Sequence, residues 1–165
     1  MNKKIVIIGG AGFIGHNLGI YLKKLGAEVT LVDSLSVNNI NSVIDNKDDL
    51  PNPDLALNFL NERLKLIKKE NIKLHIQDAR DYHVLSKILD NLKPQVVIHL
   101  AAVSHSNRSN KDPYSTFDHS FRTLENALDC SKNKVEQFIY FSSSMVYGNF
   151  NEKSVDEETN CNPLG

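Results

Sequence analysis

The sequence predicts an α/β domain with a doubly wound parallel sheet, a Rossmann fold, and two features carry this prediction. Five short apolar or alternating stretches are separated along the chain by segments whose apolar residues recur at helical spacing. The first stretch, residues 4–8, runs directly into a glycine-rich turn and then a helical pattern. This order is typical of the first strand and helix of such a sheet.

Each element follows from its local pattern. Strands are expected where β-branched and aromatic residues cluster or alternate, at residues 4–8, 28–32, 72–76, 95–100 and 138–141. Helices are expected after the glycine turn up to Gly26, over 55–70 behind a cap at Asp54, over 81–91, and from Pro113 to Ser131. The last helix has an apolar stripe made of Phe117, Phe121, Leu124 and Leu128. Residues 34–53 are polar and are expected to be mostly loop.

Length and composition exclude several classes of protein. The 165 residues fit one domain, residues 1–165, and the formal charge of -1 argues against a nucleic-acid binder. No apolar run is long enough to span a membrane, and residues 5–8 are too short for a signal-peptide core. We therefore expect a cytoplasmic protein. Neither the two cysteines nor the histidines, His105 included, show metal-ligand spacing, so no metal site is expected.

The strongest sequence signal is the glycine-rich turn after the first strand. Glycines stand at positions 9, 12 and 15, and Phe13 and Ile14 separate the last two. Such glycines let the backbone approach a pyrophosphate, whose oxygens can bind the N–H groups of the following helix. We therefore expect Gly9, Gly12, Phe13, Ile14 and Gly15 to bind the phosphates of a dinucleotide.

Two aspartates follow neighbouring strands. Asp33 ends the second strand, where a carboxylate can accept hydrogen bonds from the adenosine ribose and repel a 2′-phosphate, which favours NAD over NADP. No arginine follows within the next several residues to bind such a phosphate. Asp78 and Ala79 follow the third strand, and Asp78 is expected to accept a hydrogen bond from the adenine amino group. Either aspartate could instead cap local backbone, and Asp81 competes with Asp78 for that role.

The last two strands end in small or hydroxyl-bearing residues. Leu100, Ala101 and Ala102 follow the fourth strand and are expected to lie against the cofactor, whereas His99 reads as a core histidine. Ser142 opens a run of three serines after the fifth strand, at the edge of the sheet that faces the ligand in such folds. The same serines could simply satisfy the backbone of a turn.

Together these motifs resemble the extended short-chain dehydrogenase/reductases, and within them the NAD-dependent sugar-nucleotide epimerases and dehydratases. The residues that carry the resemblance are the glycine turn, Asp33, Asp78, residues 99–102 and residues 142–148. The resemblance implies a bound NAD that takes a hydride from a nucleotide sugar and returns it, as in UDP-glucose 4-epimerase. It also implies that the full-length protein can form a homodimer.

The resemblance further implies catalytic roles. Alignment on residues 146–148 places the catalytic hydroxyl at Ser143, with Ser144 as the alternative. The 4,6-dehydratases carry Thr-Asp-Glu where this chain has Ser143, Ser144 and Met145. Because Ser144 and Met145 cannot do the acid–base work of eliminating water, epimerase or simple oxidoreductase chemistry is favoured.

Two departures from the family pattern concern the helix after the fourth strand and the end of the chain. Ser120 stands where the family usually has Asn, and Thr123 and Leu124 stand where it often has Gly-Thr. The Tyr-x-x-x-Lys pair of the family would come just after Gly165. We therefore expect an incomplete NAD-binding Rossmann domain that lacks the later strands and the substrate domain, and is inactive alone. Another oxidoreductase or dehydratase of the family, or a non-catalytic dinucleotide-binding module, remain as alternatives.

Overall fold

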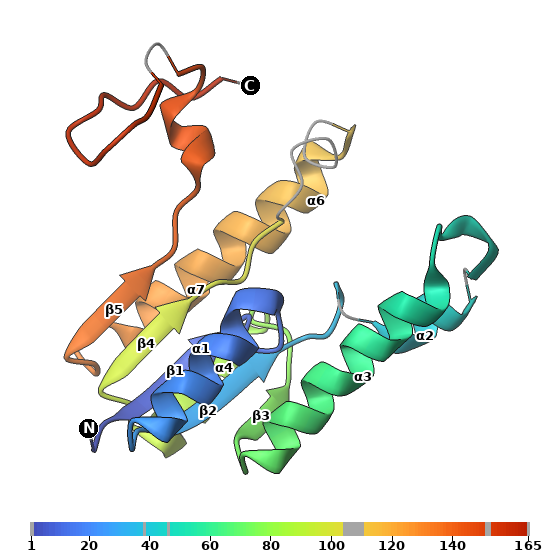
Figure 1. The fold of residues 1–165 in the computed structure, drawn as a ribbon. Coiled ribbons are helices and arrows are strands. Elements are labelled where there is room, and N and C mark those ends of the chain that lie inside the picture. The colour runs from blue at the N-terminus through green and yellow to red at the C-terminus, as the bar shows by residue number, and fades with distance from the viewer. Residues whose placement is uncertain (1, 38, 46, 104–110, 151–152, 165) are drawn as a thin grey trace.

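A five-stranded parallel sheet lies at the centre of the computed structural model, which describes residues 2–37, 39–45, 47–103, 111–150 and 153–164 (Figure 1). Its strands lie in the order β3-β2-β1-β4-β5. They are β1 (Lys4–Ile8), β2 (Glu28–Asp33), β3 (Lys73–Ile76), β4 (Val96–His99) and β5 (Gln137–Tyr140). Each neighbouring pair is parallel. This confirms the predicted α/β fold with its doubly wound sheet.

Helices cover both faces of the sheet because successive residues of the central strands are apolar and point alternately to the two faces. On one face, Ile7 and Leu31 pack beneath α1 (Phe13–Lys24) and α3 (Pro53–Lys69). On the other face, Val6 and Val32 pack beneath α4 (Tyr82–Leu92) and α7 (Thr123–Ser131). Strand β1 is buried on both faces, as expected for the centre of a parallel sheet.

Residues 34–53 contain more structure than predicted. They form the short helix α2 (Ile40–Asp45) and a 3-10 turn, η1 (Lys47–Asp49). The side chain of Asn39 accepts a hydrogen bond from the backbone N–H of Ser42, and α2 contacts α3. Local capping and tertiary packing thus order a segment whose polar composition predicted a loop.

The helix α3 begins earlier than predicted. Its N-cap is Asn52 and Pro53 occupies its first turn, so Asp54 lies inside the first turn and is not the cap. Proline is tolerated there because the first N–H groups of a helix have no intrahelical partner. The carboxylate of Asp54 still favours this end of the helix through the helix dipole.

The predicted helix from Pro113 to Ser131 is divided into three segments. A π-helical turn, η2 (Asp118–Arg122), separates α6 (Pro113–Phe117) from α7. Thr123 donates its hydroxyl to the carbonyl oxygens of His119 and Ser120, which competes with the regular hydrogen-bond pattern at this point.

The apolar stripe predicted for this helix does not pack into the core. Phe117, Phe121 and Leu128 are each about half exposed, and the rings of Phe117 and Phe121 stack with centroids 4.9 Å apart. The helix instead buries Thr123, Asn126, Ala127, Cys130 and Ser131 against the sheet. Small side chains allow the helix to approach the sheet closely, and they leave the large apolar ones outside.

Candidate cofactor-binding site

The candidate site lies at the carboxyl ends of β1 and β4. The chain passes from β1 outward to β2 and β3, and then crosses to β4 on the other side of β1. Such a reversal opens a crevice at the carboxyl edge, which is where ligands bind in open α/β sheets. The glycine-rich turn follows β1 at this point, and residues 100–102 follow β4.

The glycine turn is folded so tightly that side chains are excluded at Gly9, Gly10 and Gly15. Gly9 has φ +79°, and a Cβ atom there would lie 2.7 Å from the backbone nitrogen of Ala101. A Cβ atom on Gly15 would lie 2.5 Å from the carbonyl oxygen of Gly9. Gly9 and Gly15 therefore bring α1, the turn and the end of β4 into direct backbone contact.

The first turn of α1 lies beyond the carboxyl end of β1 and has exposed side chains, and the first N–H groups of a helix have no intrahelical partner. The helix starts at Phe13, its N-cap Gly12 has no side chain, and its first turn carries no acidic residue. The side chains of Phe13 and Ile14 are 73% and 54% exposed although both are large and apolar. An anion would be stabilised here by unpaired N–H groups and by the positive end of the helix dipole.

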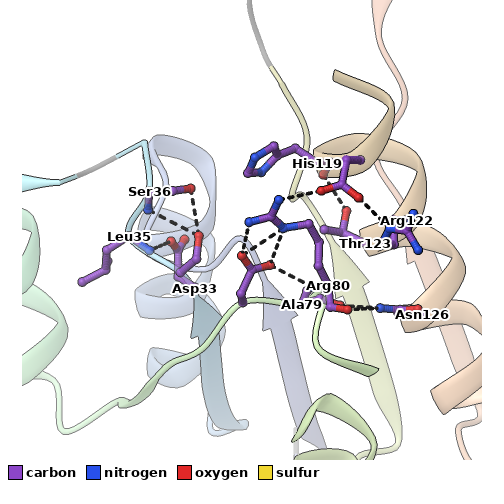
Figure 2. Close-up of polar contacts among 12 residues, drawn as sticks. Asp33, Leu35, Ser36, Ala79, Arg80, His119, Arg122, Thr123 and Asn126 are labelled. Carbon is purple, nitrogen blue, oxygen red and sulfur yellow. Dashed lines mark hydrogen bonds and ion pairs between the residues drawn. The ribbon is translucent and has the colours of Figure 1, made fainter. Parts of the chain in front are cut away.

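Asp33 connects the end of β2 to the glycine turn. Its Oδ2 accepts from the N–H of Ala11 at 2.9 Å. Its Oδ1 accepts from the N–H of Leu35 at 2.8 Å (Figure 2). The second of these is the local capping that the sequence left as an alternative. A carboxylate has about four acceptor positions, so each oxygen retains capacity for a further donor such as a ribose hydroxyl.

The carboxylate of Asp78 is held by the guanidinium of Arg80, two residues later in the chain. Oδ1 of Asp78 accepts from the backbone N–H of Arg80, and its two oxygens accept from Nε and Nη2 of the same arginine. Burial raises the pKa of Asp78, but the hydrogen bonds and charge of Arg80 outweigh it and hold the pKa below its usual range. The cap of α4 is Asp81, which accepts from the N–H of Val84. Asp78 is thus an ionised carboxylate fixed in place, and its expected contact with adenine stays a prediction.

Arg80 also bonds to the helical segment after β4. Its Nη1 donates to Asp118 at 2.6 Å, and Asp118 accepts from Nε of Arg122 at the same distance. Asn126, which is buried in α7, donates to the carbonyl oxygens of Ala79 and Arg80 (Figure 2). The turn after β3 is therefore tied to the π-helical turn and to α7 by charged and neutral hydrogen bonds.

The end of β4 is held by the same helical segment. The hydroxyl of Ser120 accepts from the N–H of Val103, and Thr123 bonds weakly to the carbonyl oxygen of Ala101 at 3.4 Å. Leu100 and Ala101 are half-buried, and Ala102 is exposed. Ser120, which stands where the family usually has Asn, thus supplies an acceptor to the backbone after β4.

His99 is a core residue, as the sequence suggested. It is fully buried between the rings of Phe138 and Tyr140, with ring centroids 6.4 and 6.1 Å away. Burial lowers its pKa to about 4, so the imidazole is neutral at physiological pH. The backbone of Ala101 opposes this shift only in part, and no described group lies in good hydrogen-bond geometry with either ring nitrogen.

The serine run lies beyond β5, at the same edge of the sheet as the crevice. Ser142, Ser143 and Ser144 are exposed, and Ser143 caps the 3-10 helix η3 (Ser144–Tyr147) by accepting from the N–H of Met145 at 3.2 Å. The turn-satisfying role that the sequence allowed is thus present. The second lone pair and the proton of the Ser143 hydroxyl can still serve a ligand.

The residues at this edge fit a bound NAD. Gly9 and Gly15, where an added Cβ atom would meet backbone, leave room for a pyrophosphate close to α1, and Asp33 has acceptor capacity for a ribose. Among the residues that the structure describes, which do not include His105, no cluster of three metal-binding side chains occurs. None of the described helices has the length and apolar character needed to cross a membrane.

Sequence reasoning missed three residues of this site. Arg63 lies on α3, far from every motif, yet its Nη1 donates to the carbonyl oxygen of Ala11 at 3.1 Å. Arg80 and Asn126 also carry no recognisable motif, although the position of Arg80 two residues after Asp78 was a usable signal. Their partners are backbone groups and carboxylates brought near by the fold.

Comparison with known proteins identifies relatives of the whole chain. A model of the NAD-dependent epimerase/dehydratase family matches residues 5–165. Protein CapI of Staphylococcus aureus is 34% identical over 146 residues, which cover 88% of this chain and 39% of CapI. The UDP-glucose 4-epimerase of Neisseria meningitidis serogroup C is 30% identical over 88% of this chain and 38% of that protein. The dTDP-D-glucose 4,6-dehydratase of Dictyostelium discoideum is 31% identical over a region that covers 96% of this chain and 33% of the dehydratase.

Solved structures agree in fold. The UDP-Glc/GlcNAc 4-epimerase of Campylobacter jejuni superposes with a TM-score of 0.78 at 23% identity, over 99% of this chain and 44% of that one. The UDP-N-acetylglucosamine 4-epimerase of Methanobrevibacter ruminantium gives a TM-score of 0.70 at 28% identity, over 98% and 44%. The chain thus spans less than half the length of the relatives it matches.

Proposed function

Because the chain belongs to the NAD-dependent epimerase/dehydratase family, we propose that it forms the NAD-binding part of a nucleotide-sugar 4-epimerase similar to UDP-glucose 4-epimerase. The dependence of the family on NAD agrees with the cofactor that the sequence predicts. The observation that carries the proposal is the backbone contact of Gly9 and Gly15, beside a carboxylate, Asp33, that binds the same turn.

Each residue group has a separate task in this proposal. The N–H groups of Phe13, Ile14 and Gly15 bind the pyrophosphate, and Asp33 accepts from the adenosine ribose. Asp78 and Ala79 line the adenine end, and residues 100–102 with Ser142 line the nicotinamide end. The chemistry that bound NAD supplies is reversible hydride exchange with a sugar carbon.

Ser143 is proposed to orient the reacting sugar oxygen. Its hydroxyl is exposed at the carboxyl edge of the sheet, and its position is fixed by the hydrogen bond from Met145. An epimerase is favoured over a 4,6-dehydratase because Ser144 and Met145 offer no carboxyl group to move a proton during elimination of water.

Turnover by the complete protein tests this function. The complete protein that contains these residues is incubated with UDP-glucose and NAD, and the formation of UDP-galactose is followed by chromatography. We expect Ser143→Ala to lower kcat by about 100-fold with little change in NAD affinity. A larger loss in Ser144→Ala would transfer the role to Ser144. Formation of a 4-keto-6-deoxy sugar would contradict the epimerase, and tight NAD binding without turnover would favour a non-catalytic module.

The exposed stripe on the helix after β4 supports self-association of the complete protein. Phe117, Phe121 and Leu128 form an apolar surface on α6, the π-helical turn and α7. Exposed apolar side chains grouped on one face favour contact with another protein surface. We propose a homodimer through this face, and sedimentation of a Phe121→Glu variant tests it, because a charge there would shift the protein toward monomers.

A further inference from the structure

Two charged side chains from different elements hold the backbone of Ala11. The N–H of this buried residue donates to Asp33, and its carbonyl oxygen accepts from Nη1 of Arg63. Asp33 comes from the end of β2, whereas Arg63 comes from α3, thirty positions later in the sequence. Both polar groups of one residue in the glycine turn are therefore satisfied by ions of opposite charge.

The charges of Arg63 and Asp33 act on each other. Burial lowers the pKa of Arg63, and the neighbouring carboxylate of Asp33 opposes this shift. An arginine remains charged in any case, because its pKa is far above physiological pH. The carboxylate that is expected to repel a 2′-phosphate thus has a cation beside it. No sequence motif indicates this neighbour, because no arginine follows Asp33 closely in the chain.

The position of Arg63 is fixed by the packing of α3. Ile67, one helical turn later, is buried in the core cluster that contains Ile7 and Leu31, and Leu64 packs against the same cluster. The helix also contacts α1. Since these contacts anchor α3 on the sheet, Arg63 is held at the glycine turn by more than its own hydrogen bond.

We propose that Arg63 is a second determinant of cofactor choice at the adenosine ribose. It holds the glycine turn through Ala11, and its positive charge lies beside the negative charge of Asp33. When Asp33 is neutralised, the site loses one negative charge while Arg63 keeps its positive charge, and this change favours the 2′-phosphate of NADP. This inference rests on the proposed NAD site, and it makes the preference for NAD a property of the pair.

Binding titrations of both dinucleotides to the complete protein test this proposal. Calorimetry gives the Kd of NAD and of NADP for the wild type, Asp33→Asn, and Asp33→Asn combined with either Arg63→Gln or Arg63→Lys. We expect Asp33→Asn to improve the affinity for NADP relative to NAD by about tenfold. Arg63→Gln should abolish this gain in the double variant, and Arg63→Lys, which keeps the charge, should retain much of it.

The single variant Arg63→Gln tests the contact with Ala11. We expect it to raise the Kd of NAD by about fivefold. Lys65→Gln is the matched control, since it removes the same charge from an exposed position of α3 and should leave both Kd values unchanged. Thermal unfolding of each variant verifies that it is folded. If the Arg63→Gln variants do not fold, the comparison of Asp33→Asn with and without Arg63→Lys still tests the proposal.

Two outcomes would overturn the proposal without affecting the NAD site. One is an equal gain in NADP affinity for Asp33→Asn with and without Arg63→Gln. The other is an NAD affinity in Arg63→Gln that matches Lys65→Gln. Failure of the wild type to bind NAD would instead overturn the NAD site itself, together with this inference.

Discussion

Arg80 holds both carboxylate oxygens of Asp78, with Nη2 2.6 Å from Oδ2 and Nε 3.0 to 3.1 Å from both oxygens. Because a third nitrogen of Arg80 bonds to Asp118, the arginine joins the turn after β3 to the π-helical turn. This arrangement places a preformed ionic network at the adenine end of the crevice. Such networks fix geometry more than they add stability when they are partly exposed.

Replacing Arg80 should therefore weaken binding more than folding. We expect Arg80→Met to raise the Kd of NAD about fivefold, because Asp78 loses the donors that fix its carboxylate. The free energy of unfolding should fall by about 1 kcal/mol, since both ion pairs are partly exposed. Calorimetric titration and urea unfolding measure the two effects. Arg122→Met is the control, because it removes a more exposed partner of Asp118 and leaves Asp78 bound.

The two glycines of α1 should differ sharply in their tolerance of a methyl group. In Gly15→Ala, the new Cβ meets backbone atoms of Gly9 and Gly10 at 2.5 and 2.7 Å, and neither atom can move without changing the turn. In Gly19→Ala, the closest atom is a side-chain methyl of Leu31 at 3.1 Å. We expect Gly15→Ala to raise the Kd of NAD at least about tenfold, and Gly19→Ala to change it less than about twofold. Equal effects of the two substitutions on the Kd would contradict this explanation.

The pattern of the chain predicted the sheet well because its strands are defined by local apolar runs. Residues 4–8 and 28–32 correspond closely to β1 and β2, and the glycine turn lies where such a fold needs it. The same reasoning failed for the helix after β4. There, the Thr123 hydroxyl donates to the carbonyl oxygen of Ser120, the Ser120 hydroxyl accepts from Val103, and Asp118 pairs with Arg80. These contacts accompany a π-helical turn that no periodicity predicts.

The site residues were predictable only where a single short segment of sequence contains both the residue and the feature that indicates its role. Asp33 was found because it ends a strand, whereas Arg63 was missed because its relation to Ala11 depends on how α3 packs on the sheet. The roles of the predicted site residues, the domain limits and the cytoplasmic location stay predictions. The titrations proposed above address the first of these directly.

The contact between Gly148 and Asn162 should control the order of the last described segment. Gly148 has φ +65°, and a Cβ atom there would meet the carbonyl oxygen of Asn162. The backbone N–H of Asn162 donates to the carbonyl oxygen of Val146. We expect Gly148→Ala to cost about 1 to 3 kcal/mol locally and to separate residues 153–164 from the turn. Hydrogen exchange at the Asn162 amide should accelerate, while amides of β1 stay protected. Asn149→Ala, an exposed neighbour, is the control and should leave the exchange at Asn162 slow.

Buried His99 should make stability depend on pH above the range in which carboxylates titrate. Its pKa is about 4 in the folded protein and about 6.5 in the unfolded chain, so the unfolded state binds the proton more readily. The stability that neutral His99 provides is complete above pH 6.5 and is lost as the pH falls toward 4, by about 3 kcal/mol in total.

A comparison of His99→Leu with the wild type isolates this contribution. The variant keeps an apolar side chain of similar size between Phe138 and Tyr140, and urea unfolding between pH 7 and pH 4.5 measures both proteins. We expect the wild type to lose stability steeply over this range and the variant to lose less, with the difference ascribed to His99. His75, whose pKa burial and Lys73 also lower, stays in both proteins and therefore cancels. Parallel pH curves would show that the imidazole is protonated in the fold or forms a bond that offsets its burial.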